Sequence, residues 1–196
     1  MNLVDPDGED IWELNQKGII TWKEVYEDNW LFYVDNLGFR QDVVQIQDRA
    51  ILDKFSQSDI GVVFYSSSIS SKDIKKLFVF LSNHTSIEWA LHKSGDTYTL
   101  GTVHSPDSSG NWEMFGVLNR PQISYHSHPG INPNMADEVY SMSVDYDNMR
   151  RFPKSKAENY YVYFPNSGYV YYLSPNGYRK ISSIYKMLGI SQGTIH

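Results

Sequence analysis

The stretch SYHSHPGINPNMADEVYSMSVDYDN, residues 124–148, combines two histidines and four carboxylates in one polar run. His126 and His128 are two residues apart, so on a β-strand both imidazoles project from the same face. Two neutral imidazoles side by side supply half of the ligands of a typical zinc site. Pro129 and Gly130 then end the strand at the edge of the sheet, where solvent can reach a bound ligand.

The C-terminal part of this stretch supplies a candidate third ligand. The run SVDYDNMRRF predicts a short helix that Ser143 caps, with Asp145 near its start and Asp147 as the alternative ligand. Two histidines and one carboxylate leave a fourth tetrahedral position for water, which is the arrangement of catalytic rather than structural zinc. Pro129 to Tyr140 are interpreted as a loop that covers the site.

Hydrolysis at such a site also needs a base that passes a proton onward. Glu88, in the run SIEWALHK, is the candidate because it interrupts an otherwise apolar predicted strand. A carboxylate is costly there unless it has a partner or a function, and an ion pair with Lys93 or Arg120 is the structural alternative. Ser141 and Ser143 are both candidates for a hydrogen bond to the oxyanion that forms during amide hydrolysis.

Composition limits the other possibilities. The 196 residues are 41% hydrophobic and 15% aromatic, which indicates a globular chain able to bury a core. The net charge of −6 and the absence of a basic block disfavour nucleic acid as a partner. Because the chain has no cysteine, a metal must be held by His, Asp or Glu. No apolar run approaches the roughly 20 residues that span a bilayer, so we expect no membrane insertion.

The order of predicted elements indicates an α+β fold with a mixed or antiparallel sheet and flanking helices. Residues 1–60 predict a small N-terminal β meander, and residues 61–196 predict the main domain. Apolar residues at helical spacing predict an amphipathic helix over residues 71–83. His84 and His92 are interpreted as surface residues, and the tyrosine-rich hairpin over residues 160–172 as part of a packed sheet.

A strand glutamate, then His-x-His-Pro, then a serine and an aspartate opening a helix, resembles the JAMM (JAB/MPN) metalloprotease motif E…HxHP…SxxD. The resemblance implies a JAB/MPN, cytidine-deaminase-like architecture and a bound Zn²⁺. It implies that His126, His128 and Asp145 are zinc ligands and that Glu88 is the general acid/base. The motif's serine stabilises the tetrahedral intermediate, but here Ser141 precedes the aspartate by four positions rather than three.

A second resemblance lies in MNLVDPDG, residues 1–8, which is similar to the segment that closes the RHS-repeat core of bacterial polymorphic toxins. Together with HSHP it resembles the JAB-like toxins found at the C-termini of such proteins. This implies a zinc peptidase or isopeptidase that is secreted or delivered into a target cell, acts on a protein or peptide, and has a cognate immunity protein. One alternative is a catalytically inactive JAB/MPN-like binding module. Another is a metal-dependent nuclease, which the net negative charge of the chain disfavours.

Overall fold

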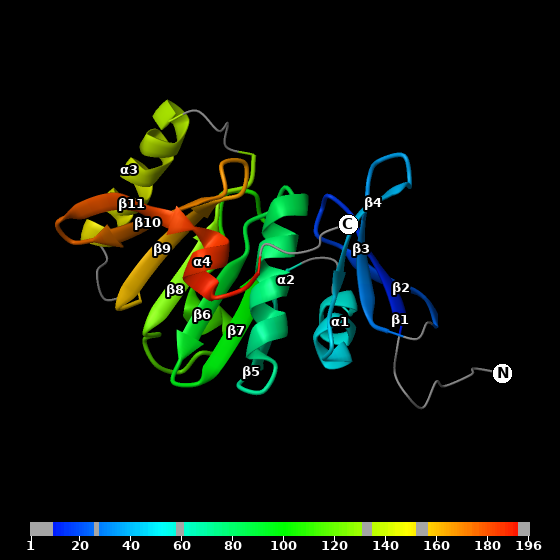
Figure 1. The fold of residues 1–196 in the computed structure, drawn as a ribbon. Helices are drawn as coiled ribbons and strands as arrows, with labels where there is room; N and C mark the ends of the chain where they lie inside the picture. The colour runs from blue at the N-terminus through cyan, green and yellow to red at the C-terminus, as the bar shows by residue number, and fades with distance from the viewer. Residues whose placement is uncertain (1–9, 26–27, 58–60, 131–134, 152–156, 192–196) are drawn as a thin grey trace.

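The computed structural model describes residues 10–25, 28–57, 61–130, 135–151 and 157–191. The octapeptide that resembles the RHS junction, residues 1–8, lies outside the described residues. The predicted α+β class is confirmed, because the described chain forms a four-stranded and a seven-stranded sheet with flanking helices. Figure 1 shows the smaller sheet and the larger sheet on either side of one long helix.

The N-terminal element is β-rich, as predicted, and ends in a helix. Its strands and helix are β1 (Asp10–Leu14), β2 (Ile20–Val25), β3 (Trp30–Val34), β4 (Arg40–Gln45) and α1 (Arg49–Ser56). The strand order is β2-β1-β3-β4, and β1 pairs with β3 in parallel. It therefore differs from a simple meander: two hairpins are joined through their first strands, a long-range pairing that no local pattern encodes.

The larger sheet has the order β11-β10-β9-β8-β6-β7-β5, and only its β8–β9 pair is parallel. Its elements are β5 (Val63–Ser67), α2 (Ser71–His84), β6 (Ala90–Ser94), β7 (Thr97–Thr102), a 3-10 turn (Trp112–Phe115), β8 (Ile123–Ser127), α3 (Met135–Arg151), β9 (Asn159–Phe164), β10 (Tyr169–Ser174), β11 (Gly177–Ser183) and α4 (Ile184–Leu188). The helix predicted over residues 71–83 is confirmed as α2.

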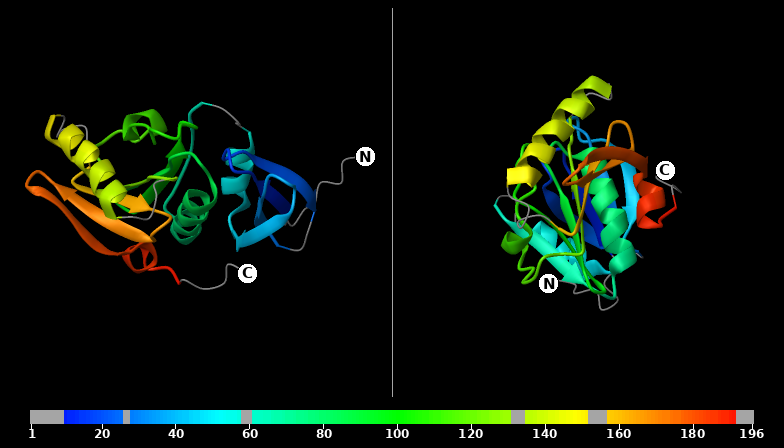
Figure 2. Two further views of the ribbon diagram at one scale, coloured as in Figure 1. Left: turned by 90° about the horizontal axis from the view of Figure 1, so that it is seen from above. Right: turned by 90° about the vertical axis from the view of Figure 1, so that its left-hand side faces the viewer.

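Helices α2 and α3 cover opposite faces of this sheet (Figure 2). Alternate residues of β9 show the division, because Tyr163 packs against Phe78 of α2, whereas Val162 belongs to a cluster with Met142 of α3. The α3 face carries the candidate site. Among the described residues, no helix is long and apolar enough to cross a bilayer.

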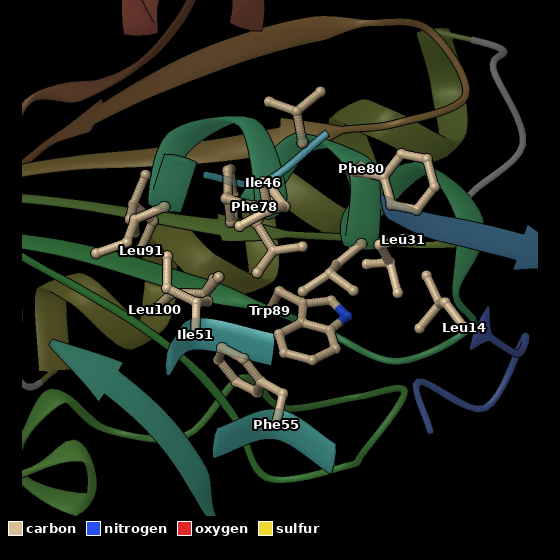
Figure 3. Packing of buried hydrophobic residues seen from close by; sticks show 14 of the residues in the cluster. Leu14, Leu31, Ile46, Ile51, Phe55, Phe78, Phe80, Trp89, Leu91 and Leu100 are labelled. Carbon is tan, nitrogen blue, oxygen red and sulfur yellow. The ribbon is translucent and has the colours of Figure 1, made fainter. Parts of the chain in front are cut away.

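One hydrophobic cluster joins the N-terminal element to the larger sheet (Figure 3). Phe55 of α1 meets Trp89 edge to face, with ring centroids 5.6 Å apart, and both side chains are buried. Burying one large apolar side chain contributes about 1.5–3 kcal/mol, so this contact is a substantial part of the interface. Trp89 adjoins Glu88, and the packing therefore fixes the backbone next to the candidate base.

Candidate metal centre

Strand β8 and the residue after it carry the two histidines near the centre of the larger sheet. His126 lies between Ala90 of β6 and Val162 of β9, which pair with it from either side. His128 follows the end of the strand, and its backbone N–H donates to the carbonyl of Tyr163. This hydrogen bond extends the pairing with β9 beyond the assigned strand, so the two-residue repeat persists and both imidazoles occupy the α3 face.

Three ligand-type atoms converge at this point. Asp145 Oδ2 lies 3.2 Å from His126 Nε2 and 3.1 Å from His128 Nε2, and the two nitrogens lie 2.6 Å apart. Tetrahedral zinc with bonds of about 2.0–2.1 Å spaces its ligand atoms about 3.3 Å apart. The nitrogen–oxygen separations agree with that spacing, and the two nitrogens would have to separate by about 0.7 Å. The donor set therefore fits zinc.

Helix α3 supplies both a ligand-type carboxylate and a serine from one face. Ser141 and Asp145 are four residues apart, so their side chains lie on the same side of the helix. Ser141 Oγ is 2.5 Å from His128 Nδ1. In the tautomer whose Nε2 carries the lone pair available to a metal, Nδ1–H donates to this hydroxyl oxygen. This hydrogen bond fixes the orientation of the ring.

Three predictions about this helix are wrong, one of them the loop over Pro129 to Tyr140, whose last six residues are helical. Helix α3 begins at Met135, so Ser143 is not its cap, and Asp145 lies well inside the helix rather than near its start. The hydroxyl of Ser143 donates instead to the carbonyl of Tyr140, as serines within helices commonly do. Asp147, the alternative ligand, is exposed. The spacing of Met142, Tyr146 and Met149 was the available signal for the longer helix, because it gives one apolar face.

Glu88 lies beside the histidines but before β6, not within a strand as predicted. Its side chain is buried, and Oε1 is 3.7 Å from His128 Nε2. The backbone N–H of Ser109 donates to its carboxylate. The alternative ion pairs are not observed, since the Lys93 ammonium lies over the Tyr98 ring and Arg120 donates to a backbone carbonyl.

The burial of these groups shifts their pKa values. Desolvation raises the pKa of Glu88 to about 7, although the positive charge of His128 opposes it. Burial alone would also raise the pKa of Asp145, but the charges and hydrogen bonds of His126 and His128 outweigh it and hold this pKa well below its ordinary value. Burial would lower the pKa of His128, yet Asp145 and Glu88 raise it overall. Asp145 is therefore ionised at neutral pH.

A cleft of about 750 Å³ opens above these residues. Glu88, His128 and Asp145 line it, with Ser141 beside them on α3; Ser143 is not among the described lining residues. Tyr140 and Val144 form an apolar wall on α3 and are 73% and 48% exposed. A substrate segment in this cleft would meet the carboxylates, the imidazole and the serine hydroxyl together.

His92 was predicted to be a surface residue, which is wrong. It is 4% exposed and lies on β6 beside Phe115, with ring centroids 5.8 Å apart. Burial lowers the pKa of His92 to about 3, so its imidazole is neutral at physiological pH. The signal that could have revealed it is the two-residue repeat, because His92 shares a face with Ala90, the neighbour of His126.

Comparison with known proteins identifies one similarity. Searches of curated proteins and of solved structures found no match to the chain. Residues 66–150, however, match the family model described as JAB-like toxin 1. The matched segment runs from β5 to the end of α3 and contains Glu88, His126, His128, Ser141 and Asp145. This part of the chain is therefore similar to JAB-like toxins, and the α+β architecture is consistent with a JAB-like fold.

Proposed function

We propose that the chain is a zinc-dependent peptidase or isopeptidase that hydrolyses an amide bond and acts as the toxin domain of a larger secreted protein. One observation carries the proposal: two imidazole nitrogens and a carboxylate oxygen converge beside a cleft that His128 and Asp145 line, with a second buried carboxylate next to them. The similarity of residues 66–150 to JAB-like toxin 1 supports a toxin of JAB/MPN type.

His126, His128 and Asp145 would hold the metal through Nε2, Nε2 and Oδ2. Bound zinc would supply a Lewis acid that acidifies a water molecule and polarises the amide carbonyl. Glu88 also belongs to a group with the two histidines whose ligand atoms lie within 4.8 Å of one another. We assign it to proton transfer because its oxygen lies further from His128 Nε2 than that of Asp145 does.

Glu88 suits both halves of the proton transfer. In the metal-free protein, burial raises its pKa to about 7, so the ionised and the protonated forms are close in free energy near neutral pH. The ionised form can accept a proton from the attacking water, and the protonated form can give it to the nitrogen of the leaving amine. A general acid/base works best when its pKa lies near the working pH, which the burial of this carboxylate provides.

Ser141 would serve the developing oxyanion. Its oxygen accepts from Nδ1–H of His128, so its own hydrogen remains available for the substrate's carbonyl oxygen. Hydrogen bonds of this kind are worth most when they strengthen as negative charge develops in the transition state. Of the two candidate serines, Ser141 is the one that lines the cleft.

The delivery route is also part of the proposal. The octapeptide at residues 1–8 resembles an RHS junction, which supports a toxin domain carried at the end of an RHS-repeat protein and released into a target cell. A cell that makes such a toxin needs a cognate immunity protein. The proposed substrate is a protein or peptide, because the apolar wall of Tyr140 and Val144 offers a contact for a polypeptide segment.

Metal content and toxicity test the function. Purified protein should contain one zinc per chain by plasma mass spectrometry, and its expression in a bacterial cytoplasm should stop growth. His126→Ala should lose zinc and toxicity, whereas Glu88→Gln should keep zinc and lose toxicity. Ser143→Ala, on the same helix but outside the described cleft lining, is the matched control and should keep both. The proposal fails if the wild type binds no zinc and the first two variants remain toxic.

A catalytically inactive binding module is the second candidate. Val139, Tyr140 and Val144 are exposed apolar residues on α3, a pattern typical of surfaces that contact another protein. In that case Tyr140→Ala should abolish growth arrest while Glu88→Gln leaves it intact. The enzyme predicts the opposite ranking, so these two variants discriminate between the candidates.

A further inference from the structure

His92 is a buried imidazole on the same sheet face as the metal centre. The β6–β8 register pairs it with Ser124 and pairs Ala90 with His126. The side chain is 4% exposed, and neither ring nitrogen hydrogen-bonds to any residue in the described part of the chain. A buried polar group without a partner costs about 1–3 kcal/mol, so His92 requires an explanation.

A small polar cavity lies between His92 and His126. Its volume is about 20 Å³, and its walls include Ser109, Ser124 and Tyr160. A cavity needs roughly 10–15 Å³ measured in this way, and two to four polar partners, to hold one water molecule. The space is therefore large enough for one water and too small for a substrate group. Its polar walls also distinguish it from the apolar cavities that stay dry.

The cavity is partly open to solvent, because the exposed Asn111 is among its lining residues. Phe115 packs near His92 and against Gly101, where an added Cβ would come within 2.8 Å of the phenyl ring. The ring can approach the sheet this closely because Gly101 has no side chain. A water in the cavity would be held between the two imidazoles by its polar lining residues.

We propose that the cavity holds one ordered water that is hydrogen-bonded to His92, and that this water orients His126 from the side away from the metal. His92 is then a positioning residue for the centre. A neutral imidazole offers one donor and one acceptor, so it can bind a water in either direction. Groups that hydrogen-bond to a metal-ligating histidine typically contribute 10–100-fold to metal affinity, because they fix the orientation of its ring. The inference rests on the proposed metal centre.

Substitutions at His92 test this role through metal binding. His92→Leu should weaken zinc affinity 10–100-fold in competition with a chromophoric chelator and should change the visible absorption spectrum of the Co²⁺-substituted protein. His92→Gln, which can also donate and accept, should stay within about threefold of the wild type. Thr99→Val is the matched control, because Thr99 is buried beside His92 on β7 but does not line the cavity. Its zinc affinity and Co²⁺ spectrum should equal those of the wild type.

Two further measurements keep the inference testable if His92→Leu does not fold. Ser124→Ala removes a hydroxyl group that lines the cavity and should, like His92→Leu, lower zinc affinity. A crystal structure of the zinc-loaded protein should show one water peak within hydrogen-bonding distance of a His92 ring nitrogen. An empty cavity, a metal ion in its place, or equal zinc affinities and Co²⁺ spectra for the wild type and His92→Leu would overturn the inference. A wild type that binds no zinc would instead refute the proposed function.

Discussion

Ser141 Oγ lies 2.5 Å from Nδ1 of His128, while Oδ2 of Asp145, four residues further along the same helix, lies 3.1 Å from Nε2. One face of α3 therefore contacts both nitrogens of this imidazole. The interval between serine and aspartate exceeds that of the motif this chain resembles by one residue. On a helix, residues three and four apart are both neighbours, so the longer interval still brings both side chains to the site.

Replacing Ser141 should weaken the centre without unfolding the protein. Ser141→Ala removes the acceptor for Nδ1–H of His128, and we expect zinc affinity to fall about 10-fold in chelator competition. Loss of the proposed oxyanion donor should lower the rate on a cleavable substrate by a further factor of about 100–1,000. Ser143→Ala changes a hydroxyl that bonds to its own helix and should alter neither quantity. Equal zinc affinity in the two variants would contradict the assigned role.

Substitutions of Asp145 and Asp147, both on α3, should have different effects on zinc binding. Asp145→Asn replaces the ionised carboxylate of the proposed ligand with a neutral amide. Zinc affinity should fall by more than about 100-fold, which exceeds the usual effect of residues that only hydrogen-bond to a ligand. Asp147→Asn changes an exposed carboxylate on the same helix and should leave a full complement of zinc. Zinc retained after dialysis, measured by mass spectrometry, checks both. The reverse ranking would make Asp147 the ligand.

The sequence predicted the parts of the site that depend on local periodicity. His126 and His128 share a face because the two-residue repeat of a strand holds wherever that strand lies in the sheet. The choice between the two serines depended on where α3 begins, and the prediction placed that start too late. Without the correct helix, the face that carries Asp145 could not be matched to Ser141.

Long-range pairing explains the remaining differences. From the sequence, His92 is expected to be a polar residue on the exposed face of a strand. In the structure, β6 lies between β8 and β7, and both faces of β6 are covered. The parallel pairing of β1 with β3 likewise depends on contacts distant in the chain. Edge and central positions are properties of the whole sheet, so the burial of His92 could not be predicted from the strand alone.

The burial of Glu88 should make the stability of the metal-free protein depend on pH. Its pKa in the folded protein, about 7, lies above its ordinary value of 4.5, so the folded state binds more protons between these values. Stability therefore falls as pH rises through this window. Glu88→Gln removes this loss, and its stability relative to the wild type should be about 2 kcal/mol more favourable at pH 8 than at pH 5. Urea unfolding in the presence of a chelator measures the difference.

The two pH values separate the charge from the contacts. At pH 5 the wild-type carboxyl is largely protonated in the folded state, so Glu88→Gln then replaces one neutral group with another. Any difference at that pH reports changed packing or hydrogen bonding. A relative stability that is the same at pH 5 and pH 8 would show that Glu88 is not a desolvated carboxyl in the folded protein.

The turn between β1 and β2 should be more sensitive to substitution than the equivalent turn between β3 and β4. Gly18 and Gly38 have φ angles of +80° and +86°, so alanine at either position should cost about 1–2 kcal/mol in backbone strain. A Cβ at Gly18 would also lie 2.3 Å from Cδ1 of Ile87, whereas one at Gly38 would meet nothing within 4 Å. Gly18→Ala should therefore cost a further 1–3 kcal/mol or so, as overpacked cores do.

A second substitution tests the contact that this difference implies. The backbone N–H of Ser86 donates to the carbonyl of Gln16, so the β1–β2 turn lies against the segment that leads to Glu88. Ile87→Val removes the atom that a Cβ at Gly18 would strike, and it should recover much of the extra loss in Gly18→Ala but none of the loss in Gly38→Ala. Thermal unfolding of the single and double variants gives the coupling energy. Strictly additive effects at Gly18 and Ile87 would mean that the turn does not press on this segment, and the contact of Phe55 with Trp89 would then be what joins the N-terminal element to the backbone beside Glu88.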